Sequence, residues 1–295
     1  MINPRFLFLG LGLSAIAIIY LIIWALMKSG PKAYRFIKSL AFSLWPALRQ
    51  NEYIAEFIYQ QPRLNHFIKK RSSRQSFVGL PLTILGLAFL YVLFAFLGLV
   101  EDFITSDQIV AIDSRLNNFL LLFRSEHYVK IFLAITTLGR ARVIISLLLA
   151  ASLLFWLWRK RAYILPAWLS LGGASLLNFL SKWAFHRPRP AFPVYIESNF
   201  SFPSGHATVA VAAYGFLTYC LLRNTKKLPN RALVFLAGLL IIAAIGFSRL
   251  YLGVHYLSDV LAGYLLGALW LTMGISLTEW QLDRQKRQET EAAPN

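Results

Sequence analysis

Charged residues are scarce in this chain, and acidic residues are the scarcest of them. Of 295 residues only 15% are charged, with 13 Asp and Glu against 30 Lys and Arg, whereas 57% are hydrophobic. An ordinary soluble domain carries about 25% charged residues. This composition excludes a disordered chain, and the single cysteine, Cys220, excludes a disulfide scaffold. The composition instead indicates an integral membrane protein.

Several apolar runs are long enough, or nearly so, to cross a bilayer as helices. We therefore predict an all-α, polytopic membrane helical bundle. The start of the third run is indistinct, because Arg140 and Arg142 interrupt it. Residues 28–76 carry aromatic and aliphatic residues at helical spacing, which predicts amphipathic helices on the membrane surface. The seven runs are 6–27, 77–100, 136–158, 162–180, 207–222, 232–247 and 256–277.

Basic residues are distributed unevenly between the runs. If seven spans alternate, one side receives ten Lys and Arg from 28–76, three from 159–161, four from 223–231 and three from 284–287. Cytoplasmic loops are enriched in Lys and Arg, so this side is predicted to be cytoplasmic. The N-terminus then lies outside and the C-terminus inside. This orientation fits a bacterial cytoplasmic (inner) membrane protein.

Two segments on the predicted extracytoplasmic side, 181–206 and 248–255, carry most of the unusual polar residues. Three of the five histidines and four of the basic residues lie there: His186, His206, His255, Lys182, Arg187, Arg189 and Arg249. Charges at helix ends in a membrane are costly and tend to mark a site. An isolated cation there would more simply be an interfacial anchor, but several together favour a binding site.

The residue types in this group favour an anion as ligand. Basic side chains and the backbone N–H groups of a Ser-Gly turn at a helix start suit a tetrahedral oxyanion such as phosphate. Glu197 and Asp259 are too few for Mg²⁺, and the cations would repel zinc, so we predict no metal and no cofactor. His186 and Arg187 are interpreted as rim residues. The predicted phosphate ligands are Lys182, Arg189, Ser204, Gly205 and Arg249.

Catalytic groups can be chosen from the same segments. His255 and Asp259 are four residues apart, so on a helix they share a face. The carboxylate would fix the imidazole tautomer and leave the other ring nitrogen free to attack. His206 suits the general acid, which protonates the leaving alkoxide and later activates water. Taken alone, His255 and Asp259 could equally be an ordinary helix-surface pair.

The spacing of these residues resembles the three-part signature of the type 2 phosphatidic acid phosphatase (PAP2) superfamily. The parts are Lys182-x6-Arg189-Pro190, Pro203-Ser204-Gly205-His206 and Ser248-Arg249-x5-His255-x3-Asp259. The resemblance covers about residues 80–278 and implies a six-helix core with metal-independent phosphatase activity. It implies His255 as nucleophile, His206 as acid and base, Asp259 as orienter and the other residues as phosphate ligands. Family substrates include undecaprenyl pyrophosphate, lipid A, phosphatidylglycerophosphate and phosphatidic acid.

The chain is therefore predicted to have three parts. These are an N-terminal transmembrane helix with a basic cytoplasmic amphipathic segment (1–76), a PAP2-like six-helix catalytic core (77–278) and a polar cytoplasmic tail (279–295). The expected partners are the bilayer and a phospholipid or polyprenyl phosphate substrate, and no nucleic acid. The alternatives are a lipid phosphotransferase using the same site, vanadate-dependent halide oxidation, and a non-catalytic lipid or anion carrier. The sequence leaves the lipid head group and the oligomeric state open.

Overall fold

The computed structural model describes residues 77–292 and a few isolated positions before them (Ser39, Tyr53, Glu56, Gln60, Gln61, Arg63 and Arg71). The chain divides into two compact units, Met1–Ser73 and Arg74–Asn295, and the elements below belong to the second. The predicted span 6–27 lies outside the described residues. The predicted amphipathic segment 28–76 also lies outside them, apart from those isolated positions.

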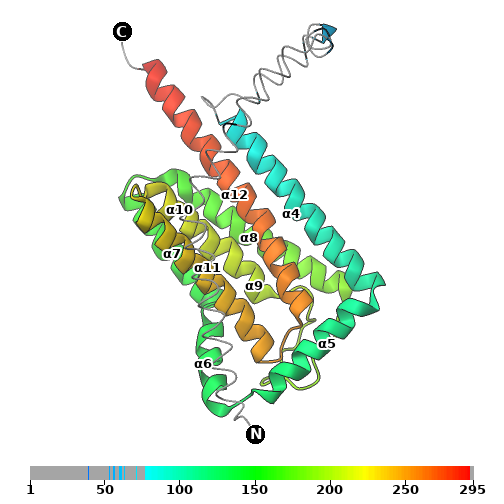
Figure 1. Ribbon diagram of the computed structural model, residues 1–295. Helices are drawn as coiled ribbons and strands as arrows, with labels where there is room; N and C mark the ends of the chain where they lie inside the picture. Colours follow the sequence, from blue (N-terminus) through cyan, green and yellow to red (C-terminus); the bar gives the residue numbers. More distant parts are fainter. Residues whose placement is uncertain are drawn as a thin grey trace. The chain divides into compact units, whose positions relative to one another are not determined.

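The described part of the second unit consists of helices and their connections (Figure 1). No strand occurs between residues 77 and 292, which confirms the predicted all-α class. In chain order the elements are α4 (Leu80–Thr105), α5 (Asp107–Leu122), α6 (Glu126–Thr137), α7 (Ala141–Leu157), the 3-10 turn η1 (Arg161–Tyr163), α8 (Ile164–Phe185), α9 (Gly205–Ala210), the π-helical turn η2 (Val211–Gly215), α10 (Phe216–Asn224), α11 (Leu228–Tyr251) and α12 (Leu257–Ala292).

Five helical stretches among the described residues are long and apolar enough to cross a membrane. They are α4, η1 with α8, α9 through α10, α11 and α12. Helices α6 and α7 pass the same test together, with a bend of 44° between them, and give a sixth span if they cross as one. The bend falls beside Arg140 and Arg142, the two residues that interrupt the apolar run.

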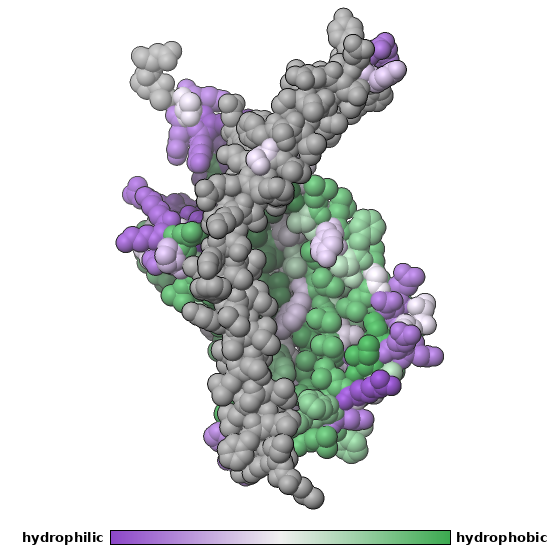
Figure 2. Space-filling model, in the orientation of Figure 1, coloured by the Kyte–Doolittle hydropathy of each residue, from purple (hydrophilic) through white to green (hydrophobic). Residues whose placement is uncertain are grey.

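The outer surface of these helices is apolar. Leu87, Phe94 and Leu97 on α4 and Leu239 on α11 are among the large hydrophobic side chains that are exposed. Figure 2 shows apolar side chains over the middle of the described helices and polar ones toward their ends. Such a surface is costly in water but matches the hydrocarbon of a bilayer. The chain is therefore a multi-pass membrane protein.

The core of the bundle lies around α12. This helix packs against α8, α4 and α9, and its buried residues Ala262 and Leu266 meet Phe96 of α4 and Phe202. A second cluster, between α7, α8 and α10, is formed by Ile144, Leu148, Phe155, Tyr163, Ala167, Leu171, Ala213, Phe216 and Cys220.

Glycines let α12 approach α9 closely. A Cβ atom at Gly263 would lie 2.6 Å from the Ser204 carbonyl oxygen, and one at Gly267 would lie 2.5 Å from the Thr208 carbonyl oxygen. Both neighbours are backbone atoms, so only a helix shift could accommodate a side chain. The close approach lets the Ser204 N–H donate to the carbonyl oxygen of Asp259 at 2.8 Å. The start of α9 is thereby held against the start of α12.

The helix directions separate two ends of the described bundle (Figure 1). At one end α8 and α11 finish and α9 and α12 begin, so the connections 186–204 and 252–256 lie together. The basic groups at 159–161, 223–231 and 284–287 lie at the other end. The polar residues after Glu279, predicted as a tail, continue α12 as far as Ala292.

Candidate active site

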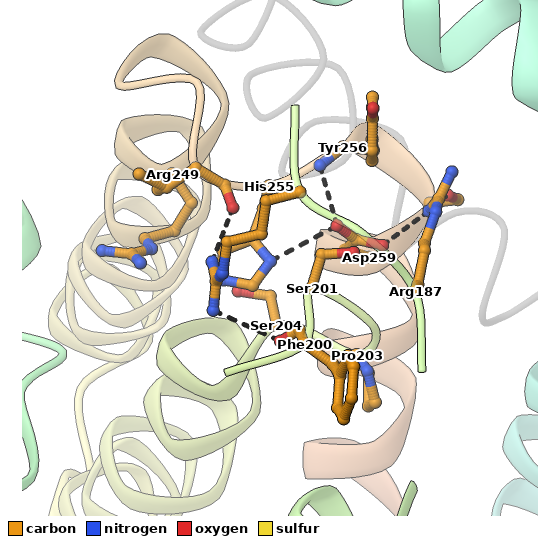
Figure 3. A network of polar contacts seen from close by, with 12 residues as sticks. Arg187, Phe200, Ser201, Pro203, Ser204, Arg249, His255, Tyr256 and Asp259 are labelled. Atoms are coloured by element: carbon orange, nitrogen blue, oxygen red, sulfur yellow. Dashed lines mark hydrogen bonds and ion pairs between the residues drawn. The ribbon is translucent and has the colours of Figure 1, made fainter. Parts of the chain in front are cut away.

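Four residues predicted to bind and cleave a phosphate, Ser204, Arg249, His255 and Asp259, come together where α12 begins (Figure 3). Lys182 lies in the last turn of α8, Arg249 in the last turn of α11, and Ser204 precedes α9. These residues are buried although they are polar. The exposed fraction is 8% for Lys182, 0% for Ser204 and 0% for Arg249, and it is 2% for His255 and 0% for Asp259.

His255 and Asp259 are paired, but they do not lie on one helix as predicted. Helix α12 begins at Leu257, so His255 belongs to the connection that precedes it. Asp259 lies in the first turn of α12, and its Oδ2 accepts the backbone N–H of Tyr256 at 2.9 Å. His255 Nδ1 lies 3.3 Å from the same oxygen. The side chain of Asp259 thus folds back over the helix start and meets the imidazole there.

Two contacts define the tautomer of His255. Its Nδ1 faces the Asp259 carboxylate, and its Nε2 lies 3.2 Å from Nη1 of Arg189. A carboxylate only accepts and a guanidinium only donates hydrogen bonds. The hydrogen therefore sits on Nδ1 and the lone pair on Nε2. The unprotonated nitrogen Nε2 faces the arginine side of the site.

The imidazole of His255 is neutral at neutral pH. Burial is the main cause, and the positive charges of Arg249 and Arg189 add to it, so the pKa of His255 lies well below its ordinary value. Neutral imidazole is the form that can attack an electrophile. The environment therefore keeps the lone pair of Nε2 available.

Two arginines converge on one anionic group. Glu197 Oε2 lies 2.7 Å from Nη2 of Arg189, and Glu197 Oε1 forms an ion pair with Nη2 of Arg249. Burial alone would raise the pKa of Glu197, but the charges of Arg249 and Arg189 outweigh it and lower the pKa to about 2. The carboxylate is thus ionised. The position between the two guanidinium groups has the size and charge complementarity for an oxyanion.

Further donors around this position lack partners. Ser204 Oγ and Arg249 Nε are buried and have no hydrogen-bond partner among the described residues. Gly205 begins α9, and N–H groups of a first helical turn have no intrahelical acceptor. Buried donors without partners are costly. Their presence here is typical of a site that takes an acceptor-rich ligand.

The remaining predicted residues, Lys182 and His206, border the same region. The ammonium of Lys182 donates to the carbonyl oxygen of Phe200 in the connection before Ser204. His206 lies in the first turn of α9 and is half-buried. Gly139 leaves room for its ring, because a Cβ there would lie 2.9 Å from Cδ2 of His206. The bend between α6 and α7 therefore packs directly on this imidazole.

Arg124 joins the end of α11 to the connection 186–204. This guanidinium donates from Nε to the Tyr251 carbonyl oxygen at 3.1 Å and from Nη1 to the Phe192 carbonyl oxygen at 2.5 Å. Gly253 has a φ of +64°, and a Cβ there would lie 2.0 Å from Nη2 of Arg124. The left-handed backbone conformation favours glycine at this turn. The turn links Arg249 to His255 over a short stretch of chain.

The structure brings together every predicted site residue, but the prediction for Arg187 was wrong. Arg187 is not at the rim: only 7% of it is exposed, and it forms ion pairs with Asp113 and Asp259. His186, the other predicted rim residue, is exposed and adopts the left-handed conformation that ends α8. Its side chain packs on Phe200 at 4.5 Å between ring centroids.

Sequence reasoning did not single out three residues that contact the site. Asp113 of α5 reaches Arg187, Thr136 of α6 accepts from Nη1 of Arg249 at 2.9 Å, and the Tyr195 hydroxyl accepts from the same nitrogen. Asp113 and Thr136 lie far from the signature in the chain and carry no local pattern. Tyr195 lies within the signature loop, where an aromatic residue with a polar group could have drawn attention.

Comparisons with known proteins agree with this geometry. A family model described as the PAP2 superfamily matches residues 163–283. The chain is 32% identical over 179 residues to phosphatidylglycerophosphatase B of Bacillus subtilis (strain 168). The aligned region covers 60% of this chain and 88% of that protein. It is 29% identical over 106 residues to an undecaprenyl-diphosphatase of Sulfolobus acidocaldarius, and there it spans only 47% of the relative's length.

The fold is also similar to a solved structure. The crystal structure of a transmembrane PAP2 type phosphatidylglycerolphosphate phosphatase from Bacillus subtilis superposes with a TM-score of 0.60 and 29% sequence identity. The match covers 67% of this chain and 96% of that chain. The similarity therefore includes nearly the whole of the solved protein.

Proposed function

Since this chain belongs to the PAP2 superfamily and is a phosphatase acting on lipid phosphates, we propose that it removes the terminal phosphate of a membrane lipid at the extracytoplasmic face. The reaction proceeds through a phosphohistidine and needs no metal. The substrate belongs to the class of phosphatidylglycerophosphate, undecaprenyl pyrophosphate, phosphatidic acid and lipid A. Phosphatidylglycerophosphate is the first to test, because the similarity to phosphatidylglycerophosphatase B extends over 88% of that protein's length.

One observation carries this proposal: the convergence of Arg189 and Arg249 on a single anionic group beside Nε2 of His255. Arg189 touches both Nε2 and the carboxylate of Glu197. A phosphate that replaced this carboxylate would lie against Nε2, within reach of the Ser204 hydroxyl. Cations and preorganised donors at this position stabilise the charge of the transferring phosphoryl group.

The first step transfers the phosphoryl group to the enzyme. Nε2 of His255 attacks phosphorus as the bond to the lipid oxygen breaks, and His206 donates a proton to that oxygen. The imidazole becomes positively charged, and its Nδ1–H donates to the side chain of Asp259. The dephosphorylated lipid leaves.

The second step releases inorganic phosphate. His206, now unprotonated, accepts a proton from a water molecule that attacks phosphorus. The bond between phosphorus and Nε2 breaks, and His255 returns to the neutral form that its surroundings favour. Arg189 and Arg249 bind the product phosphate until Glu197 or a new substrate replaces it.

The proposed face follows from the distribution of charge. The basic groups at 159–161, 223–231 and 284–287 lie at the opposite end of the described bundle from His255. Basic residues are enriched on the cytoplasmic side of membrane proteins. This supports a site on the periplasmic or extracytoplasmic side of a bacterial inner membrane, with the N-terminus out and the C-terminus in.

The activity is tested by incubating the purified protein with the four candidate lipids and measuring inorganic phosphate. We expect release from at least one of them in the presence of a metal chelator. No release from any lipid, or release that requires an added divalent cation, would contradict the proposal. Adding an acceptor lipid alcohol distinguishes hydrolysis from transfer, because a phosphotransferase would form phosphorylated acceptor in place of free phosphate.

The face is tested with the same assay on sealed membrane vesicles. A short-chain, water-soluble phosphatidic acid should be hydrolysed by right-side-out vesicles without detergent. Activity confined to inverted vesicles would reverse the proposed orientation and leave the chemistry intact.

A groove between α4 and α12 suits the lipid tail. Its volume is about 460 Å³, and its lining includes Gly98 and Leu99 on α4 and Leu261 and Leu265 on α12. Leu261 follows Asp259 by two residues, so the groove runs along the same helix that carries the catalytic carboxylate. A mostly apolar groove on the helix that carries Asp259 suits the hydrocarbon chain of a lipid substrate.

Gly98→Leu tests this groove. A Cβ at Gly98 meets no other atom of the described residues within 4 Å, so the substitution fills space without moving the helix. We expect KM for a long-chain lipid phosphate to rise by about tenfold, equivalent to ~1.4 kcal/mol of lost tail contact. KM for a dihexanoyl substrate should not change.

Gly86→Leu is the matched control. Gly86 lies on the same helix, a Cβ there also meets none of the described atoms within 4 Å, and it does not line the groove. It should leave both KM values unchanged. An equal rise for long and short chains in the Gly98 variant would show that the groove does not hold the tail.

A further inference from the structure

We propose that Arg187 and Asp113 form a positioning network behind the catalytic pair, which keeps the Asp259 carboxylate directed at Nδ1 of His255. This inference rests on the proposed function, in which His255 is the nucleophile. It gives Arg187 a part in catalysis that is separate from phosphate binding.

The two oxygens of Asp259 have separate partners. Oδ1 accepts from Nη1 of Arg187 at 2.5 Å, whereas Oδ2 faces Nδ1 of His255 and the backbone N–H of Tyr256. Figure 3 shows Asp259 lying between His255 and Arg187. A carboxylate held at both oxygens cannot rotate away from the imidazole. The Arg187 contact therefore defines which oxygen is presented to His255.

Arg187 is itself held rigidly. Its guanidinium carbon lies 4.6 Å from the centroid of the Phe103 ring and 4.3 Å from that of Tyr256. Stacking on aromatic rings stabilises a planar cation. Its Nη2 donates to Asp113 at 2.7 Å, and its Nη1 also donates to Ser258 Oγ at 2.7 Å. Both terminal nitrogens are occupied within the protein, so Arg187 is not placed to bind substrate.

Asp113 anchors the same network from α5. Its Oδ1 accepts the backbone N–H of Ser258 at 3.0 Å, and its Oδ2 accepts from the Ser258 hydroxyl and from Arg187. Only 2% of Asp113 is exposed. Ser258 immediately precedes Asp259, so Asp113 holds the first turn of α12 in position while Arg187 holds the carboxylate.

The charges of this network suit the reaction. Two carboxylates and one guanidinium leave one negative charge in a buried region. When Nε2 of His255 takes up the phosphoryl group, the imidazole becomes positive and the negative charge beyond Nδ1 stabilises it. A buried carboxylate without a cationic partner would instead favour the protonated form. The positive charge of Arg187 opposes this protonation, and so favours the form of Asp259 that accepts the hydrogen bond from Nδ1.

The test is a double-mutant cycle on kcat with Arg187→Gln and Asp259→Asn. Arg187→Gln should lower kcat by roughly 10- to 100-fold, the usual effect of losing a supporting partner, and change KM by less than about threefold. In the Asp259→Asn background the same substitution should change kcat by less than about twofold, because Arg187 acts through that carboxylate. Arg187→Lys, which restores the charge but not the fork, should recover part of the loss.

Asp113→Asn is the second variant, in case Arg187→Gln does not fold. Asparagine keeps the shape of the side chain. Asp113→Asn should lower kcat, as Arg187→Gln does. In the Asp259→Asn background it should not lower kcat further. Arg223→Gln is the matched control, since it removes an arginine from a partly exposed pair with Glu279 at 3.1 Å. It should leave kcat unchanged.

Two results would overturn the inference. One is that Arg187→Gln lowers kcat by the same factor in the wild-type and Asp259→Asn backgrounds. If Arg187 served only folding, its loss would reduce the amount of folded enzyme equally in both. The other is unchanged kcat in Arg187→Gln and Asp113→Asn. If His255→Ala retained full activity, the proposed function itself would fail, and this outcome is distinct from both.

Discussion

Replacing His255 by alanine is expected to reduce release of phosphate from the lipid substrate by roughly 10⁴- to 10⁶-fold, the range for losing a nucleophile or its base from a catalytic unit. In the proposed mechanism Nε2 is the atom that accepts the phosphoryl group, and the variant has no atom in its place. Lipid binding should change by less than about threefold, because Arg189, Arg249 and Ser204 remain and supply the contacts to phosphate. Inorganic phosphate release and binding of a labelled lipid phosphate measure the two effects separately.

The substitution should not unfold the protein. Asp259 keeps the Tyr256 N–H and Arg187 as partners when the imidazole is removed. His127→Ala is the matched control, because His127 is an exposed histidine on α6. It should retain normal turnover. Normal turnover in the His255 variant would exclude the phosphohistidine route, whereas loss of both binding and turnover would indicate a collapsed site.

The composition and spacing of the chain predict the class of fold because each signal is local. An apolar run long enough for a bilayer predicts a spanning helix without reference to its neighbours. Even so, the predicted runs 207–222 and 232–247 are shorter than the helices 205–224 and 228–251. The missing ends carry Gly205, His206 and Arg249, which are polar or small and belong to the candidate site. Hydropathy alone therefore ends a helix where its functional part begins.

The candidate site could be predicted as a group of residues but not as a geometry. The spacing of His255 and Asp259 suggested a shared helix face, whereas the carboxylate reaches back over the helix start to an imidazole that precedes it. Arg187 had no distinguishing signal beside Arg189. Its partner Asp113 lies on α5, and only the folded chain shows that the two meet. Contacts between distant segments follow from packing, which single-sequence patterns do not encode.

Replacing His206 by alanine is the second substitution with a large expected effect, and it should affect the two half-reactions differently. His206→Ala should lower turnover of a lipid phosphate by roughly 10²- to 10⁴-fold, the usual contribution of a general acid and base. The lipid oxygen is a poor leaving group and needs the proton that His206 supplies. A substrate with a good leaving group, such as 4-nitrophenyl phosphate, does not need it. With that substrate the first step should remain fast while hydrolysis of the phosphoenzyme, which needs a base, becomes slow.

The His206 variant should therefore accumulate phosphate covalently bound to Nε2 of His255. A mass increase of one phosphoryl group, stable in alkali and lost in acid, would identify a phosphorylated histidine. The double variant His206→Ala with His255→Ala should show no such mass increase, because the acceptor atom is gone. If His206→Ala released 4-nitrophenol without accumulating phosphorylated enzyme, His206 would not be the base that hydrolysis of the phosphoenzyme requires. Because the two histidines would give opposite labelling results, this experiment separates the attacking group from the group that moves the proton.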